Sequence, residues 1–187
     1  MPDALELLKT RRSVKPLAMT AEVPSKEDID TILTIAARVP DHGKLTPWRF
    51  IVFEGDARAR AGELFAKVFK DKNPTADEAA VATERKRFAQ SPLVIAVVSR
   101  AAPHAKIPEF EQILSAGASG MNILTAAHAL GYSADWVTGW MAFDRDVMSG
   151  LGLAANEKIA GFIHIGRTPQ PAADRPRPEL SEIVTRF

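Results

Sequence analysis

The sequence predicts a three-layer α/β/α fold, in which helices cover both faces of one sheet. Segments with a helical period alternate along the chain with short apolar runs that are typical of buried strands. The chain has 187 residues, of which 46% are hydrophobic and 25% charged, and this is the size and composition of one globular domain. We therefore expect residues 1–187 to form a single domain.

Capping signals and periodicity locate the predicted helices. Asp3 and Ser25 are each followed three residues later by an acidic residue, Glu6 and Asp28, as is typical of a first helical turn. Apolar residues then recur at helical spacing, and Pro40 ends the second helix. On these grounds we expect helices at residues 3–10, 25–39, 56–70, 77–90, 108–130 and 144–151. The highly charged fourth helix is expected to lie on the surface.

Four short apolar runs are predicted to be strands, at residues 48–53, 93–99, 132–137 and 159–165. Their largely uninterrupted apolar character is typical of strands that are covered on both faces. Periodicity does not reveal the order of these strands. The proline-rich segment after residue 167 is not expected to form regular structure, and it is either a frayed end or an extension that docks elsewhere.

Composition and charge exclude several classes of function. A net charge of +1 gives no electrostatic case for binding nucleic acid, and no run approaches the roughly 20 apolar residues of a membrane span. The N-terminus carries acids where a signal peptide needs bases, so we expect a cytoplasmic protein. With no cysteine and no metal-ligand spacing among the four histidines, redox chemistry would need a bound organic cofactor.

Two guanidinium groups and a hydroxyl follow the first predicted helix, at Arg11, Arg12 and Ser13. Arginine presents a planar fork of donors and keeps its charge, which suits a terminal phosphate dianion. An adjacent arginine pair is also common on a solvated surface, so this motif alone does not decide between the two.

Two further motifs accompany the arginine pair. The run ARVPDHGKLTPWRF at residues 37–50 ends a helix and enters a strand, and the run AAHALG at 126–131 leads to DWVTG at 135–139. In this order and at these spacings, the three motifs resemble the FMN-dependent nitroreductases, and most closely their short, single-domain branch. The resemblance covers nearly the whole chain.

The resemblance implies an α+β sandwich with a central mixed sheet that forms an intertwined homodimer, with residues 168–187 crossing to the partner subunit. It implies an FMN-dependent oxidoreductase that uses NADH or NADPH to reduce nitroaromatic, quinone or related small acceptors by ping-pong hydride transfer. Because the flavin makes the bonds, no catalytic side chain is expected. The resemblance does not identify the physiological acceptor or the preferred nicotinamide. One alternative is a low-turnover flavin carrier or sensor, and another is a cofactor-free hydrolase built on Asp41, His42 and a serine.

The resemblance also assigns candidate FMN-binding residues to three regions. The first region holds the phosphate, the second reaches the flavin of the partner subunit, and the third passes the flavin ring. These residues are Arg11, Arg12 and Ser13 for the phosphate, Arg38 and His42 for the partner's flavin, Trp136, Val137 and Thr138 for the ring, and Arg167, ranked ahead of Arg175 and Arg177, as a further phosphate donor.

Some of these residues also have a purely structural interpretation. Arg38 could cap the end of a helix, His42 could be an ordinary loop residue, and Trp136 could belong to the core. Val137 stands where relatives can carry a basic residue, so any side-chain contact with an anion is lost at that position.

Overall fold

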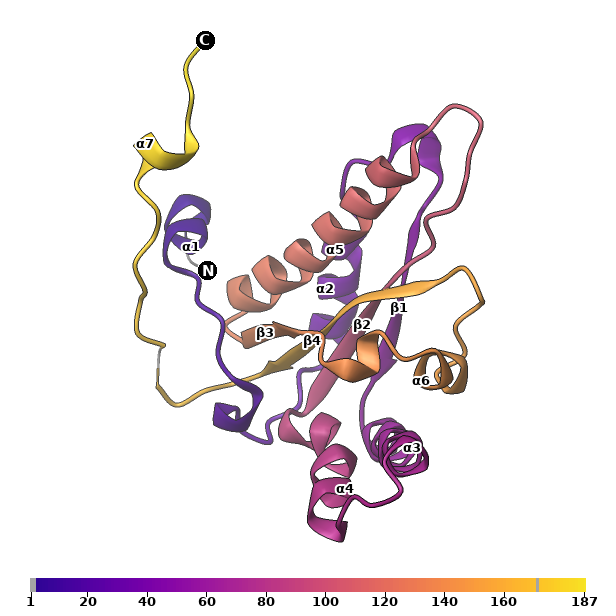
Figure 1. Cartoon of the computed structure of the whole chain (residues 1–187). Helices are drawn as coiled ribbons and strands as arrows, with labels where there is room; N and C mark the ends of the chain where they lie inside the picture. Colours follow the sequence, from indigo (N-terminus) through magenta and orange to yellow (C-terminus); the bar gives the residue numbers. More distant parts are fainter. Residues whose placement is uncertain (1–2, 171) are drawn as a thin grey trace.

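The computed structural model describes residues 3–170 and 172–187, and its centre is a four-stranded sheet (Figure 1). The strands are β1 (Trp48–Phe53), β2 (Leu93–Ser99), β3 (Ser133–Val137) and β4 (Lys158–Gly166), in the order β1-β2-β4-β3. The α+β class is confirmed, but the expected mixed sheet is wrong for the described residues, because all three neighbouring pairs are antiparallel. The long helical connection between β1 and β2 reverses the chain, and apolar runs carry no record of strand direction.

All six predicted helices are present, although several bounds differ. Helix α2 ends three residues before the predicted end, and the predicted helix at 77–90 divides into a helix and a 3-10 turn. The helices are α1 (Ala4–Thr10), α2 (Lys26–Ala36), α3 (Asp56–Lys72), α4 (Glu78–Arg85), α5 (Glu109–Ala129), α6 (Arg145–Gly150) and the short α7 (Leu180–Ile183). The 3-10 turns are Pro16–Ala18, His42–Lys44, Arg87–Gln90 and Trp140–Ala142.

Two hydrophobic cores lie on opposite faces of the sheet, and strand β2 contributes to both. Ile95 and Val97 pack in the core that includes α2 and α5, whereas Val94 and Ala96 pack in the core that includes α3 and α6. Figure 1 shows these helical layers on either side of the strands. Successive strand residues point to opposite faces, so a fully apolar strand needs a cover on each. This arrangement is the predicted three-layer sandwich.

The segment after α4 is part of the core and not, as expected, a purely surface element. Phe88 in the 3-10 turn is completely buried, with its ring centroid 4.8 Å from that of Phe65 and 5.0 Å from those of Phe53 and Phe162. Such aromatic pairs add about 0.5–1.5 kcal/mol each beyond their buried area. One aromatic residue among many charges was too weak a signal to predict this contact.

Helix α5 packs against the sheet at a place that needs two glycines, one on the helix and one on strand β4. A Cβ atom on Gly120 of α5 would lie 2.6 Å from the ring of Trp136, and one on Gly161 of β4 would lie 1.9 Å from its Nε1. The indole N–H of Trp136 donates to the carbonyl of Ala160 at 3.1 Å. The indole of Trp136 is therefore wedged between helix and sheet, at a place where only glycine leaves room.

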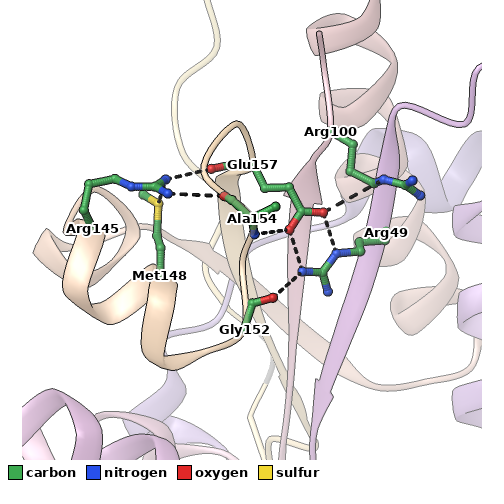
Figure 2. Close-up of polar contacts among 7 residues, drawn as sticks. All are labelled: Arg49, Arg100, Arg145, Met148, Gly152, Ala154 and Glu157. Carbon is green, nitrogen blue, oxygen red and sulfur yellow. Dashed lines mark hydrogen bonds and ion pairs between the residues drawn. The ribbon is translucent and has the colours of Figure 1, made fainter.

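A charged cluster ties the loop before β4 to the far edge strand (Figure 2). The Glu157 carboxylate accepts two hydrogen bonds from Arg49 of β1, both 2.7 Å long, and one from the backbone of Ala154 at 2.9 Å. The Arg49 guanidinium holds the pKa of Glu157 down at about 2. Arg145 of α6 donates to the backbone carbonyl of Glu157, and Arg100 lies 3.9 Å from its carboxylate. These contacts connect β1 to β4 across β2.

Candidate functional site

A pocket of about 300 Å³ lies between the segment that follows α1 and the C-terminal end of α5. Arg11 and Arg12 line it together with His128 of α5 and Ser133 of β3. The backbone N–H of Val14 donates to the carbonyl of Ala134 at 3.2 Å, which holds this segment against strand β3. The structure thus places the predicted phosphate arginines in a pocket and not on an open surface.

Arg11 carries an unsatisfied donor in this pocket. Its Nη1 atom is buried, and no hydrogen-bond partner for it occurs within residues 3–170 and 172–187. Burial lowers the pKa of Arg11, and the nearby positive charges of Arg177, Arg12 and Arg175 lower it further. A partly buried guanidinium without a partner is costly, and an anion that entered the pocket would remove that cost. The donor set therefore fits a phosphate.

Arg12 is held by the C-terminal segment and by α5. Its Nε donates to the carbonyl of Ala173 at 3.0 Å and lies 3.8 Å from the Asp174 carboxylate. The carbonyl oxygen of Arg12 lies 2.8 Å from Nε2 of His128. The C-terminal segment of the chain and its N-terminal motif therefore meet at the mouth of this pocket.

Arg167 does not join the arginines of the pocket. Its Nε donates to Glu22 at 2.6 Å, its Nη1 donates to the carbonyl of Gly131 at 3.1 Å, and its guanidinium lies 4.4 Å from the centre of the Tyr132 ring. These three contacts give Arg167 a structural role in the folded chain. Arg175 and Arg177 lie close enough to Arg11 for their charges to lower its pKa, whereas Arg167 pairs with Glu22.

Ser13 lies beside Asp135 of strand β3. Burial raises the pKa of Asp135, while the nearby hydroxyl of Ser13 and the charge of Lys15 act in the opposite direction. The residue next to Ser13 is therefore a protein carboxyl group in this structure.

Polar side chains of α5 fasten the segment that carries Arg38 and His42. The side-chain amide of Asn122 donates to the carbonyl oxygens of residues 35 and 38, at 3.0 and 3.1 Å. The hydroxyl of Ser115 donates to the carbonyl oxygen of residue 40 at 2.6 Å. Glu111 lies 2.8 Å from Nδ1 of His42. These positions recur at helical spacing and share one face of α5. Arg38 and His42 are both exposed, so the segment is held firmly while these side chains remain available.

Within one chain, the structure does not bring His42 close to the arginine pair. Glu111, which contacts His42, is near the start of α5, whereas His128, which contacts Arg12, is at its end. Seventeen residues separate these two helix positions, a distance of about 26 Å along an α-helix. The two predicted groups of residues thus lie at opposite ends of one helix.

The third predicted region, at the end of β3, divides between the two faces of the sheet. The side chain of Trp136 packs in the core beside α5, as its structural interpretation predicted. Val137 and Thr138 line a separate cavity of about 110 Å³, together with Phe88 and His164. The side chain of Trp136 therefore does not join Val137 and Thr138 at one surface.

The sequence reasoning missed His128 as a member of the site. A histidine in the last turn of a helix is a common favourable position, and this was the signal available in the sequence. Its contact with Arg12 is tertiary and spans 116 residues.

The described contacts do not support the hydrolase alternative. Nδ1 of His42 faces a carboxylate, and Asp41 accepts the backbone N–H of Thr46 at 2.9 Å. Over the described ranges, no serine hydroxyl is bonded to His42. The described residues also contain no cluster of three or more potential metal ligands.

None of the helices in the described part of the chain is both long and apolar enough to span a membrane.

Comparisons with known proteins relate the chain to one family. A model of the family described as "Nitroreductase family" matches residues 8–167. YdjA of Escherichia coli K12, whose name assigns it provisionally to the NAD(P)H nitroreductases, is 36% identical over 189 residues that cover 99% of this chain and 100% of YdjA. A similarly named protein of Haemophilus influenzae is 34% identical over 88% of each chain.

Solved structures share the fold. A nitroreductase-like family protein from Bacillus cereus superimposes with a TM-score of 0.83 at 21% identity, covering 100% of this chain and 97% of that one. A protein from Desulfovibrio desulfuricans, provisionally named a nitroreductase and solved in complex with FMN, gives a TM-score of 0.75 at 23% identity over 100% and 98% of the two chains. With the match over residues 8–167, this chain belongs to the nitroreductase family.

Proposed function

We propose that the chain is an FMN-dependent oxidoreductase that uses NADH or NADPH to reduce small acceptors such as nitroaromatic compounds and quinones. The unsatisfied Nη1 donor of Arg11, in a pocket rich in arginine, is the observation that carries this proposal. The FMN complex of the similar Desulfovibrio structure and the names of the curated relatives support the same cofactor and electron donor.

The side chains around the pocket would hold the phosphate end of FMN. Arg11 and Arg12 line the pocket, and Arg175 and Arg177 lie close enough to influence the charge on Arg11. Guanidinium groups bind a phosphate dianion by paired, charge-assisted hydrogen bonds, which are stronger than neutral ones. This cluster fits the anionic end of FMN better than it fits a neutral ligand.

Bound FMN would supply the redox chemistry by accepting a hydride from the nicotinamide and then reducing the acceptor, in a ping-pong sequence. The residues of the chain bind and orient the participants. With no cysteine in the sequence and no metal cluster among the described residues, the protein offers no other redox group of these two types. No side chain needs to act as a catalytic acid or base in this scheme.

We further propose that the active form is a homodimer in which two copies of α5 pack antiparallel. Phe110, Leu114, Gly117 and Met121 recur at positions i, i+4, i+7 and i+11, and the three large side chains are 68%, 55% and 37% exposed. A Cβ atom on Gly117 would meet nothing within 4 Å. An exposed apolar stripe with a glycine in its middle suits the close approach of a second helix.

An antiparallel pair would also complete the site. A twofold axis places the start of one α5 beside the end of the other. His42 and Arg38 of one subunit would then approach the arginine pocket of its partner and cross the separation of about 26 Å that exists within one chain. This arrangement gives both predicted groups of residues a role at the same flavin.

The C-terminal segment would contribute to the same association. Leu180, Ile183 and Phe187 are at least 64% exposed, and α7 buries none of its residues. Figure 1 shows this yellow segment ending away from the sheet. Apolar side chains with no core of their own favour docking on the partner subunit over a free end.

The first experiment measures FMN binding. The purified protein should show flavin absorption, and anaerobic NADH or NADPH should bleach it. Arg11→Ala should weaken FMN binding about tenfold to a hundredfold, because one charge-assisted hydrogen bond is worth about 1.5–3 kcal/mol. Lys9→Ala, which removes an exposed positive charge from α1, is the matched control and should leave the affinity unchanged. Equal affinities for the two variants would contradict the proposed phosphate site.

Bleaching also separates the proposal from its alternative. A yellow protein that neither NADH nor NADPH can reduce would be a carrier or sensor and not an oxidoreductase.

The second experiment measures association. Gly117→Glu places a charge at the centre of the apolar stripe, where the monomer has room for it, and should convert the dimer to a folded monomer. Ala59→Glu on the exposed face of α3 is the control and should remain dimeric. Sedimentation at equilibrium gives the mass of each variant, and a dimeric Gly117→Glu variant would exclude this face as the interface.

A further inference from the structure

Two hollows of the structure lie at the two ends of strand β3. Ser133, the first residue of the strand, lines the pocket that contains Arg11 and Arg12. Val137, the last residue, lines the separate cavity of about 110 Å³. The two residues are four positions apart, a distance of about 13 Å along a strand. Because alternate residues of a strand point to the same face, Ser133 and Val137 face the same side of β3.

The backbone after the arginine pair runs beside β3 from one hollow to the other. Arg12 lines the arginine pocket, and Pro16 lines the second cavity. Between them, the backbone N–H of Val14 donates to the carbonyl of Ala134 in β3. Figure 1 shows this indigo segment next to β3. A ligand that spanned both hollows would therefore lie along β3 and residues 12–16.

Asp135 occupies the midpoint of this path. It points to the same face as Ser133 and Val137, and it is half-buried. Burial raises its pKa, while the nearby hydroxyl of Ser13 and the charge of Lys15 act in the opposite direction. An ionised carboxyl group offers only acceptor atoms, and its burial is costly unless donors reach it. A ligand that passes Asp135 should therefore present hydrogen-bond donors to it.

The hydrogen-bonding groups change in kind along the path. The first pocket offers the N–H donors of Arg11 and Arg12, and the midpoint offers the acceptors of Asp135. The second cavity is lined by Gln90 and Thr138, whose side chains can both donate and accept. FMN carries the complementary groups in the same order. Its phosphate accepts, the hydroxyls of its ribityl chain can donate, and the edge of its ring has both carbonyl oxygens and an N–H.

We propose that Asp135 is a cofactor-binding residue whose carboxylate accepts hydrogen bonds from the ribityl hydroxyls of FMN. This inference rests on the phosphate site of the proposed function. The carboxylate would select a flavin with a polyol chain over one with a plain alkyl chain. It lies two strand positions, or about 7 Å, beyond Ser133. Because like charges repel, it would also keep the phosphate at the arginine end and so fix the direction of the cofactor.

The test compares FMN with an analogue in which a pentyl chain replaces the ribityl chain and keeps the terminal phosphate. Quenching of flavin fluorescence on binding to the apoprotein gives both dissociation constants. The wild type should prefer FMN about tenfold to a hundredfold, the range for one hydrogen bond to a charged group. Equal affinities of the wild type for the two ligands would overturn the inference without any variant.

Replacement of Asp135 assigns the preference to its carboxylate. Asp135→Ala should bind FMN about tenfold to a hundredfold more weakly and the pentyl analogue as well as the wild type does, so the preference should disappear. Asp135→Asn keeps the size of the side chain and should lose part of the preference, because a neutral amide accepts more weakly. Asp30→Ala, on the exposed face of α2, is the matched control and should behave as the wild type. Equal weakening of both ligands by the Asp135 variants would show a purely structural role and overturn the inference.

Riboflavin separates this inference from the phosphate site, because it keeps the hydroxyls and lacks the phosphate. The wild type and Asp135→Ala should both prefer FMN to riboflavin. Loss of that preference in the wild type would refute the phosphate site. A wild type that prefers FMN to riboflavin but not to the pentyl analogue would refute the role of Asp135 alone. Failure to bind any of the three flavins would refute both.

Discussion

Replacing Glu157 by glutamine removes the charge at the centre of the cluster in Figure 2. Two arginines, Arg49 and Arg100, lie at this carboxylate, which is only 9% exposed, and Arg49 holds its pKa at about 2 against an ordinary value of 4.5. A difference of about 2.5 pKa units corresponds to roughly 3.4 kcal/mol. Because Arg49 is 32% exposed and the amide retains one acceptor, we expect Glu157→Gln to lower the unfolding free energy by about 2–3 kcal/mol at pH 7.

The same pKa shift predicts how this difference changes with pH. A carboxylate with a lowered pKa in the folded state stabilises the protein fully above its unfolded pKa, and the stabilisation is lost as the pH falls from about 4.5 toward 2. At pH 3 roughly 1.4 kcal/mol of it should remain. Urea unfolding, followed by the fluorescence of the three tryptophans, gives the free energies of both proteins at each pH.

Glu63→Gln is the matched control for this measurement. Glu63 lies 2.9 Å from Arg85 and is 65% exposed, so its pair should contribute less than about 0.5 kcal/mol. A loss below about 1 kcal/mol for Glu157→Gln at pH 7, or an equal loss at pH 7 and pH 3, would refute the argument that burial gives this cluster its strength.

Two further substitutions test the cores on either side of the sheet. Burial lowers the pKa of His164 to about 4 from 6.5, so the wild type loses stability as the pH falls below 6.5, by about 2 kcal/mol at pH 5. His164→Phe removes the hydrogen bond between Nδ1 of His164 and the hydroxyl of Ser91, so it should cost about 1–3 kcal/mol at pH 7. Because the variant has no group that titrates here, it should not lose the further ~2 kcal/mol that the wild type loses by pH 5, as urea unfolding measures. An equal loss between pH 7 and pH 5 in both proteins would contradict this reasoning. Gly161→Ala should cost about 1–3 kcal/mol, because its Cβ would meet Trp136. Thermal unfolding measures this cost, and an unchanged Tm would refute the wedge.

Local residue patterns predicted the elements of this fold well. The runs at residues 48–53 and 93–99 are strands with the same bounds in the structure. The second is buried on both faces, which requires an unbroken apolar run, whereas the first is a half-buried edge strand that carries Arg49. Strand direction was not predictable, since burial is the same for parallel and antiparallel neighbours. The position of Phe88 was also missed, because a single aromatic residue on a charged segment does not reveal which core it enters.

The candidate site was predictable only in part. The Arg11-Arg12 motif led to a pocket because a short motif stays together in any fold. The position of His42 at the far end of α5 depends on the tertiary contact with Glu111, and the sequence spacing of the two residues does not indicate it. Arg167 was ranked ahead of the tail arginines because it follows a strand, but its partner Glu22 is 145 positions away in the sequence.

Among the arginines of this chain, the partner distinguishes a structural role from a binding role. Arg49 has the carboxylate of Glu157, and Arg167 has that of Glu22, so each charge is balanced within the protein. Arg11 is partly buried, close to other arginines, and its Nη1 has no partner in the described residues. An unpaired buried donor costs about 1–3 kcal/mol, and an anion from outside the chain would offset that cost. The missing partner of Arg11 is therefore better evidence for an anionic cofactor than the arginine pair in the sequence.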